Sequence, residues 1–504
     1  MDTATPPKPA YAELTRLQLQ IYRFRHFASM GWWDRAAMMP PKGNEARAAA
    51  QAELEAHIHR LTTDARQEDL IAAADGEALD EIERANLREI RREWRLATAL
   101  PESLVQAQLI AGARCEHAWR TQRKANDWKG FLPNLREVMR LAREEAQLLA
   151  EAAGVSRYEA MLDRYEPGMT TAVLDRVFGD LRSWLPGLVA KVKEKQARER
   201  VVEPTGPFPV AKQREVSLAV VKLLGFDFEG GRLDESAHPF NGGVPEDIRM
   251  TTRYNEAGCI DSLMSTIHET GHARYEQNLP RDWLGQPIGR ARSSAIHESM
   301  SLAFEMQLAR GRAFVGLLAP MLARAYGEQP AFEPGNLHRL FTRVKAQNLI
   351  RVKADECTYP LHVILRYEIE RPLVEGEIEC EDIPALWDEK MKALLGLDTR
   401  GNYENGCMQD VHWSEGLIGY FPTYTLGAMY AAQWFAAIRR ATPDLDRRVA
   451  AGDPGAAFDW IRANVWSQGR RWETPEFARR ASGEPLNPSH FRAHLEARYL
   501  DAPA

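Results

Sequence analysis

The chain has 504 residues, 44% hydrophobic and 27% charged, a composition that is ordinary for a soluble protein with a large buried core. Its formal net charge is −6, and the 65 basic and 71 acidic residues are interspersed, which argues against a nucleic-acid-binding surface. No apolar run is long enough to cross a membrane, so neither nucleic acid nor a membrane is expected as a partner.

The cysteines and the amino terminus indicate a cytoplasmic protein. The cysteines are odd in number, scattered and without C-x-x-C spacing, which is typical of reduced thiols rather than of a disulfide framework or a metal cluster. They are Cys115, Cys259, Cys357, Cys380 and Cys407. The first residues contain no apolar stretch of the kind found in signal peptides, so residues 1–10 are expected to be a short disordered tail.

Residues 11–200 are expected to form a helical scaffold, because apolar residues recur at helical spacing between proline and glycine breaks. The predicted helices of this region cover residues 11–30, 43–61, 76–100, 102–126, 128–154, 156–164, 171–181 and 183–200. One more helix is predicted over residues 210–224.

The pattern changes over residues 225–256, where glycine-rich turns separate short apolar segments. This pattern predicts a small β-sheet, with three strands as the expected number. The segment from Asp247 to Tyr254 is its clearest strand. An edge of such a sheet could bind an extended peptide by strand addition.

Residues 261–312 are predicted to hold two long helices. The first begins at an N-cap residue, Asp261 or Ser262, and ends by 278, and the second covers 291–312. Further helices are expected over residues 314–326, 336–351, 354–373, 383–396, 425–450 and 454–467. No linker-like segment interrupts the chain, so residues 11–504 are expected to form one mainly α-helical catalytic domain around a groove.

The first of these two helices carries the sequence His268-Glu269-Thr-Gly-His272. Residues four apart on a helix project from one face, so the two histidines can share a Zn²⁺. Glu269 lies beside them and can take a proton from a metal-bound water. The alternative is a solvated helix face with two ordinary histidines. It is disfavoured because the apolar residues Ile267 and Tyr275 lie near the same face.

A catalytic zinc site needs a third protein ligand and an open position. The candidates are Glu276, His297, Glu298 and Glu305. Glu276 is two turns from the first histidine, which is too far for a compact site. Glu298 is the preferred ligand, because a second helix packed against the first can present one carboxylate and complete a His₂Glu set. His297 is then expected to be an outer or core residue.

The chain resembles the Taq-type thermostable metallocarboxypeptidases, a cytosolic H-E-x-x-H family, over nearly its whole length. The family's motifs occur here in order as His238-Pro-Phe240, Asp247-Ile-Arg-Met-Thr251, His268-Glu-Thr-Gly-His272, His297-Glu-Ser-Met-Ser301, Ile350-Arg-Val-Lys-Ala-Asp355 and Gly406-Cys-Met-Gln-Asp-Val-His-Trp413. Three residues depart from the usual pattern, and none of them is an expected ligand: Met300, Lys353 and Cys357.

The resemblance implies His268, His272 and Glu298 as zinc ligands and Glu269 as the general base. It also implies a mostly helical fold with a small sheet beside a long active-site groove, and a homodimer. The family removes single residues from the C-termini of peptides with broad side-chain tolerance, and Zn²⁺ or Co²⁺ supports its activity. The metal-site helices fall within 261–312, and the segments that contact substrate are expected within 336–430.

A carboxypeptidase must bind the free C-terminal carboxylate of its substrate, and arginine is suited to this task. Arg351 is the candidate that matches the family. The alternative is a surface or ion-paired arginine, for example with Asp355 four residues on. By resemblance, His238 and Arg249 line the groove and contact substrate, although they could equally support a turn and a strand.

Residues 409–424 are dense in glycines and polar aromatic side chains. A zinc peptidase needs hydrogen-bond donors directed at the developing oxyanion. Tyr420 is the first candidate and His412 the second, and Tyr424 could hold the substrate terminus. The alternative for each is a buried aromatic cluster. Two other functions remain open: an endo-oligopeptidase with the same metal site, and a helical peptide-binding protein with a structural metal.

Overall fold

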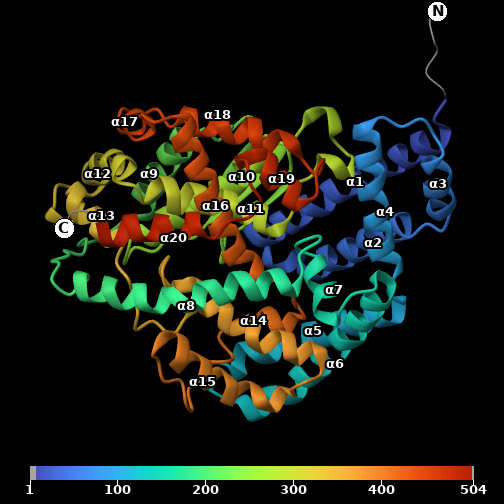
Figure 1. Cartoon of the computed structure of the whole chain (residues 1–504), viewed down its shortest axis with the longest axis horizontal. Helices are drawn as coiled ribbons and strands as arrows, with labels where there is room; N and C mark the ends of the chain where they lie inside the picture. The colour runs from blue at the N-terminus through green and yellow to red at the C-terminus, as the bar shows by residue number, and fades with distance from the viewer. Residues whose placement is uncertain (1–6, 502–504) are drawn as a thin grey trace, which may run out of the picture.

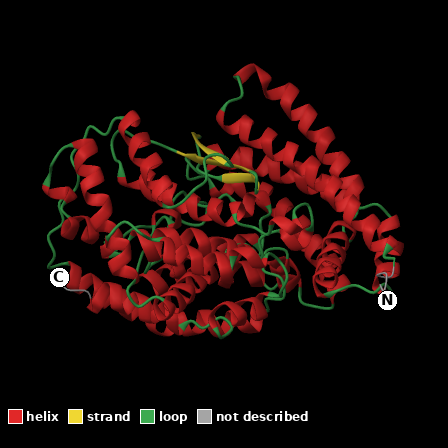
Figure 2. Ribbon diagram, turned by 90° about the horizontal axis from the view of Figure 1, so that it is seen from above, coloured by secondary structure: helices red, strands yellow, loops and turns green. Residues whose placement is uncertain are grey.

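The computed structural model describes residues 7–501. It is mainly α-helical with one small sheet, as the sequence predicts (Figure 1, Figure 2). In the view of Figure 1 the long helix α8 crosses the middle of the molecule. Helices α5, α6, α14 and α15 lie below it, and α10, α11 and α16 lie above it. None of the described helices is long and apolar enough to cross a membrane.

Within residues 7–501, nine α-helices precede the sheet. They are α1 (Pro9–Ala37), α2 (Asn44–Thr62), α3 (Arg66–Asp75), α4 (Glu81–Thr98), α5 (Glu102–Gln122), α6 (Trp128–Ala153), α7 (Arg157–Asp163), α8 (Thr171–Gln196) and α9 (Val210–Leu223). The predicted tail is too long, because α1 begins at Pro9, and residues 1–6 lie outside the described part. The predicted division of α8 is wrong: the helix continues through Pro186, flanked by the buried Leu185 and Leu188.

The sheet consists of β1 (Gly231–Glu235), β2 (Asn241–Val244) and β3 (Asp247–Thr252) in the order β1-β3-β2. Strand β3 is central, parallel to β1 and antiparallel to β2. Ile248 and Met250 of β3 are buried against Ala273 of the helix that follows, because alternate strand residues point to the same face. This packing places the edge strand β2 beside the histidine motif.

The two helices after the sheet are α10 (Ile260–Gln277) and α11 (Ser294–Leu302), and a π-helical turn over Ala303–Ala309 follows α11. The predicted N-cap of α10 is wrong, because Cys259 occupies that position. The second helix is shorter than predicted. Its N-cap is Ser293, whose side chain accepts a hydrogen bond from the Ile296 N–H.

Nine more α-helices follow in the described part of the chain: α12 (Arg312–Tyr326), α13 (Pro334–Phe341), α14 (Tyr359–Glu375), α15 (Ile383–Leu395), α16 (Pro422–Ala441), α17 (Leu445–Ala450), α18 (Gly455–Asn464), α19 (Thr474–Ser482) and α20 (Ser489–Glu496). The helix predicted over 336–351 ends ten residues early. Beyond it, the backbone N–H of Lys345 bonds the Asp355 carboxylate and that of Arg351 bonds the Gln409 side chain. These side chains replace the helical hydrogen bonds.

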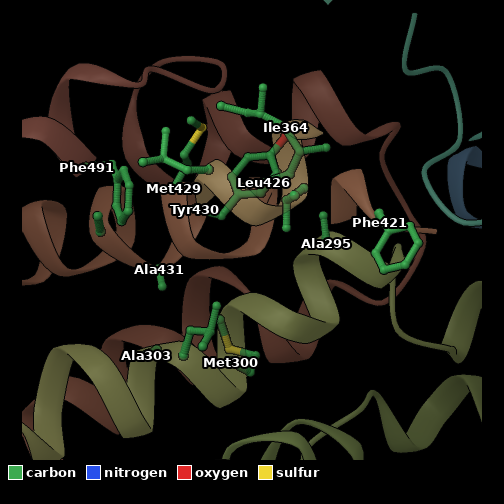
Figure 3. Close-up of a cluster of buried hydrophobic side chains, with 14 of the residues drawn as sticks. Ala295, Met300, Ala303, Ile364, Phe421, Leu426, Met429, Tyr430, Ala431 and Phe491 are labelled. Atoms are coloured by element: carbon green, nitrogen blue, oxygen red, sulfur yellow. The ribbon is translucent and has the colours of Figure 1, made fainter. Parts of the chain in front are cut away.

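Helix α11 is held between α10 and α16 by close approaches at two glycines. A Cβ atom on Gly271 of α10 would lie 2.4 Å from the Met300 carbonyl oxygen of α11. A Cβ atom on Gly427 of α16 would lie 2.7 Å from Cγ of Glu298. Figure 3 shows Met300 and Ala295 of α11 among buried apolar side chains that α16 contributes. Only glycine permits helices to approach this closely.

Replacing Gly271 with alanine therefore tests this packing. The new Cβ would press on the backbone of α11, so Gly271→Ala should lower the free energy of unfolding by about 1–3 kcal/mol. Gly179→Ala in α8 is the matched control, because a Cβ there meets nothing within 4 Å. It should be neutral or stabilise the protein by up to about 1 kcal/mol. Equal melting temperatures for the two variants would contradict the packing.

Candidate metal centre and active site

Three predicted ligands come together between α10 and α11. Nε2 of His272 lies 3.4 Å from Oε2 of Glu298, and Nε2 of His268 lies 3.9 Å from the same oxygen. The three ligand atoms all lie within 4.8 Å of one another. Ligands bonded to one tetrahedral Zn²⁺ at about 2.0–2.1 Å are about 3.4 Å apart, so this donor set fits such an ion.

His268 is oriented by a carboxylate behind it. Its Nδ1 lies 3.0 Å from Oε2 of Glu305, and Glu305 in turn accepts a 2.6 Å hydrogen bond from Arg310. The contact through Nδ1 leaves Nε2 directed at the ligand group, an arrangement common for metal-binding histidines. Burial lowers the pKa of His268, but the hydrogen bond to Glu305 and the charge of Glu298 outweigh it and raise the pKa to about 10. These carboxylates therefore stabilise positive charge at this position.

His272 is supported by His297, which the sequence analysis predicts to be an outer or core residue and not a ligand. The ring of His297 stacks on that of His272, with centroids 4.6 Å apart, and its Nε2 lies 2.8 Å from Oε1 of Glu276. Glu276 and His297 thus pair with each other, and Glu305 pairs with His268 and Arg310. Of the four candidates for the third ligand, Glu298 is the one that joins the two histidines.

Glu269 is held beside the ligand group by the sheet. Asn241 of β2 donates a 3.1 Å hydrogen bond to Oε2 of Glu269, which is 9% exposed. The sequence analysis did not predict a role for Asn241, although this residue directly follows the motif that ends at Phe240. The small sheet therefore fixes the carboxylate expected to act as the base.

Arg351 lies in a second cluster and is buried, with 3% of its surface exposed. Its Nε and Nη2 donate to Oδ1 of Asp410 at 3.0 and 2.8 Å, and its Nη1 donates to the hydroxyl of Tyr359. The alternative of an ion-paired arginine is met, but the partner is Asp410 and not the suggested Asp355. Arg366 binds the other oxygen of Asp410, so two guanidinium groups share one carboxylate. The cluster keeps an excess of positive charge beside the tyrosines.

Three aromatic side chains link this cluster to the metal ligands. Nε2 of His412 lies 3.1 Å from the Tyr424 hydroxyl, and the Tyr424 ring lies 4.9 Å from Cζ of Arg351. The Tyr420 ring lies 5.2 Å from that of Tyr424. Burial chiefly, and the nearby charge of Glu298, raise the pKa of both tyrosines. Burial and then the charge of Arg351 lower the pKa of His412 to about 3, so His412 is neutral.

The segment before Tyr420 is fixed by a carboxylate that the sequence did not single out. Glu370 is fully buried and accepts hydrogen bonds from Trp413 Nε1 at 2.7 Å, Gly419 N at 2.8 Å and the Tyr158 hydroxyl at 2.9 Å. Burial raises the pKa of Glu370 to about 7 despite these bonds. Glu370 therefore positions Tyr420 rather than contacting the metal ligands.

The two remaining predicted residues, Arg249 and His238, make contacts within the sheet region. Arg249 of β3 pairs with Asp247 and packs on the ring of Trp33, whose centroid is 4.5 Å from its Cζ. His238 is exposed in the turn between β1 and β2, where its carbonyl oxygen accepts a hydrogen bond from Ser236. These contacts agree with the alternative in which the two residues support a strand and a turn.

Comparison with known proteins bears on this geometry. The family model described as carboxypeptidase Taq (M32) metallopeptidase matches residues 13–499. The chain belongs to this family. It is 36% identical to thermostable carboxypeptidase 1 of Thermus thermophilus, over 98% of this chain and 99% of that protein. It is 32% identical to carboxypeptidase 1 of Bacillus subtilis, over 97% of each chain.

Solved structures of the family share the fold. Metallocarboxypeptidase 1 of Trypanosoma cruzi superposes with a TM-score of 0.96 at 48% identity, covering 98% of this chain and all of that one. The M32 carboxypeptidase of Deinococcus radiodurans superposes with a TM-score of 0.91 at 31% identity, covering 98% and 99%. The chain is thus a peptide hydrolase of the metallocarboxypeptidase class, and His268, His272 and Glu298 form its candidate metal site.

Proposed function

We propose that this protein is a zinc-dependent carboxypeptidase that removes single residues from the C-termini of peptides. The convergence of two imidazole nitrogens and one carboxylate, with Glu269 beside them, is the observation that carries the proposal. Zn²⁺, for which Co²⁺ could substitute, would be held by His268, His272 and Glu298. When bound, it supplies a water of pKa about 7 and polarises the scissile carbonyl.

The side chains then act in sequence. Glu269 takes the proton of the attacking water and later passes it to the leaving amine, while Asn241 keeps its carboxylate in place. The Tyr420 hydroxyl donates to the oxyanion that develops on the substrate, with His412 as a second candidate donor. Arg351, together with Tyr424, binds the substrate's terminal carboxylate, so that the last peptide bond lies at the metal ligands.

Several finer assignments belong to the same proposal. The substrates are peptides with free C-termini and broadly varied side chains. The family resemblance adds His238 and Arg249 to the residues that bind them, while their contacts in the structure are those of a turn and a strand support. Residues 11–504 act as one catalytic domain. A single hydrophobic cluster supports this for the residues from Cys115 to Tyr499. The protein is cytoplasmic, supported by five buried free cysteines, and a homodimer, as the family resemblance implies.

The role of Glu269 is tested by Glu269→Gln, which keeps the size of the side chain and removes its basicity. Turnover of a free-acid peptide should fall by about 10²–10⁴-fold, the usual contribution of a general base. The metal content, measured by elemental analysis after dialysis, should match that of the unaltered protein. Glu298→Gln should instead lose the metal. Asp261→Asn, on the exposed first turn of the same helix, should change neither quantity. Substantial activity in Glu269→Gln would refute the assignment.

The role of Arg351 is tested by Arg351→Gln on matched peptides with a free or an amidated C-terminus. Losing one charge-assisted hydrogen-bonding group should lower kcat/KM for the free acid by about 10- to 100-fold. The already poor amide should be little affected, because it has no carboxylate to lose. Circular dichroism should show a folded protein, since Arg366 still pairs with Asp410. An equal loss on both peptides would argue against carboxylate recognition.

A further inference from the structure

A cavity of about 410 Å³ lies beside the metal ligands, on the side of His297. His297 lines it and stacks directly on His272. Tyr165 also lines it, and its ring lies 5.0 Å from that of Tyr420. The cavity is therefore one side chain away from both the metal ligands and the proposed oxyanion donor. Its volume is far larger than the roughly 30 Å³ that one water takes up in the liquid, so it has room for an amino-acid side chain.

The lining of this cavity is strongly basic. Six arginines contribute to it: Arg25, Arg92, Arg164, Arg290, Arg292 and Arg470. Among the described residues that line it, Glu276 supplies the one carboxylate, and that group is paired with His297. The remaining lining residues carry no charge and include the end of β2 with Pro245 after it, and residues 283–286.

The carboxylates that pair with the lining arginines do not neutralise all of their positive charge. Glu93 receives Arg290 at 2.6 Å, Arg470 at 2.9 Å and Arg25 at 3.6 Å, so one carboxylate serves three guanidinium groups. Burial alone would raise the pKa of Glu93, but the three arginines hold it at about 2 and the carboxylate stays ionised. The other three lining arginines have one carboxylate partner each: Arg292 with Glu89, Arg92 with Asp163, and Arg164 with Glu145.

The cavity and Arg351 are linked through the two tyrosines. Arg351 contacts Tyr424, Tyr424 contacts Tyr420, and Tyr420 contacts Tyr165, at 4.9, 5.2 and 5.0 Å. The path from Arg351 through the two tyrosines to Tyr165 is therefore no longer than about four extended residues. With the substrate terminus at Arg351, the cavity lies within reach of residues on the amino-terminal side of the scissile bond.

We propose that this arginine-lined cavity binds an acidic side chain, aspartate or glutamate, of the substrate upstream of the scissile bond. The inference rests on the proposed carboxypeptidase function and adds a specificity to it. A carboxylate in the cavity would complete the charge balance of the Glu93 cluster and form charge-assisted hydrogen bonds with guanidinium groups.

The test uses three sets of free-acid peptides that differ only in carrying Glu, Gln or Lys at each of the four positions before the C-terminal residue. The measured quantity is kcat/KM for release of that C-terminal residue. At one of these positions the Glu peptide should be preferred over the Gln peptide by about tenfold or more, and the Lys peptide should be poorest. The preference should weaken in about 0.5 M salt, because screening is stronger there.

Arg25→Gln is the informative variant, because Arg25 is partly exposed and makes the longest of the three contacts with Glu93. It should reduce the preference for Glu about threefold or more while leaving the Gln peptide unchanged. Arg290→Gln should do the same more strongly. Arg23→Gln is the matched control: it removes the same charge from the same helix, and Arg23 is exposed and points away from the cavity.

The possible failures can be told apart. An absence of any preference for Glu, or a preference that Arg25→Gln leaves intact, would overturn the inference while the release of C-terminal residues stands. If Arg25→Gln slowed all free-acid peptides equally and spared amidated ones, the cavity would bind the terminal carboxylate and the inference would be wrong. If no peptide lost its C-terminal residue, the proposed function would fail and the inference with it.

Discussion

The close approach of α10 and α11 is the constraint on which the site depends. Two imidazole nitrogens on one helix can share a metal with Glu298 only if the second helix lies almost in backbone contact. Gly271 permits that contact on one side of α11, and Gly427 permits α16 to press against Glu298 on the other. Buried apolar side chains fill the remaining space between α11 and α16 (Figure 3). Helix packing thus sets the ligand distances before any side chain is oriented.

Buried ion pairs then orient the individual groups. Glu305 directs His268, Asp410 fixes Arg351 and Arg366, and Glu93 gathers three arginines behind the cavity. A buried charge is tolerated only when it is paired and hydrogen-bonded, so each of these carboxylates restricts its partners to one geometry. At Asp410 and at Glu93, more than one arginine shares a single carboxylate. That excess is the property that a site for peptide carboxylates requires.

The sequence predicts the parts of the site that depend on local spacing. The histidines and Glu269 follow from the H-E-x-x-H motif and its spacing on a helix. Glu298 follows from the need for a third ligand on a neighbouring helix and from the family resemblance. Asn241, Glu305 and Glu370 were not predicted as supports, because their hydrogen bonds join residues far apart in the chain and leave no periodic signal. Glu305 was weighed only as a ligand.

The fold shows the same division. The helical class and the three-stranded sheet were predicted from periodicity and turn residues. The errors arose where tertiary contacts outweigh local preference. Helix α13 ends early because Asp355 and Gln409 capture backbone N–H groups, and α8 continues through Pro186 because its neighbours are buried. The π-helical turn after α11, which carries Glu305, has no signature in the pattern of apolar residues.

The protein is proposed to remove peptide residues one at a time from the C-terminus, with a metal held between α10 and α11 by His268, His272 and Glu298. Mass spectrometry of a mixed peptide pool, digested by metal-depleted protein with and without added Zn²⁺, tests it most directly. The predicted result is a ladder of products, each shorter by one C-terminal residue, that forms only after Zn²⁺ is restored. Internal cleavage products, or an identical ladder from the metal-depleted protein, would contradict the claim.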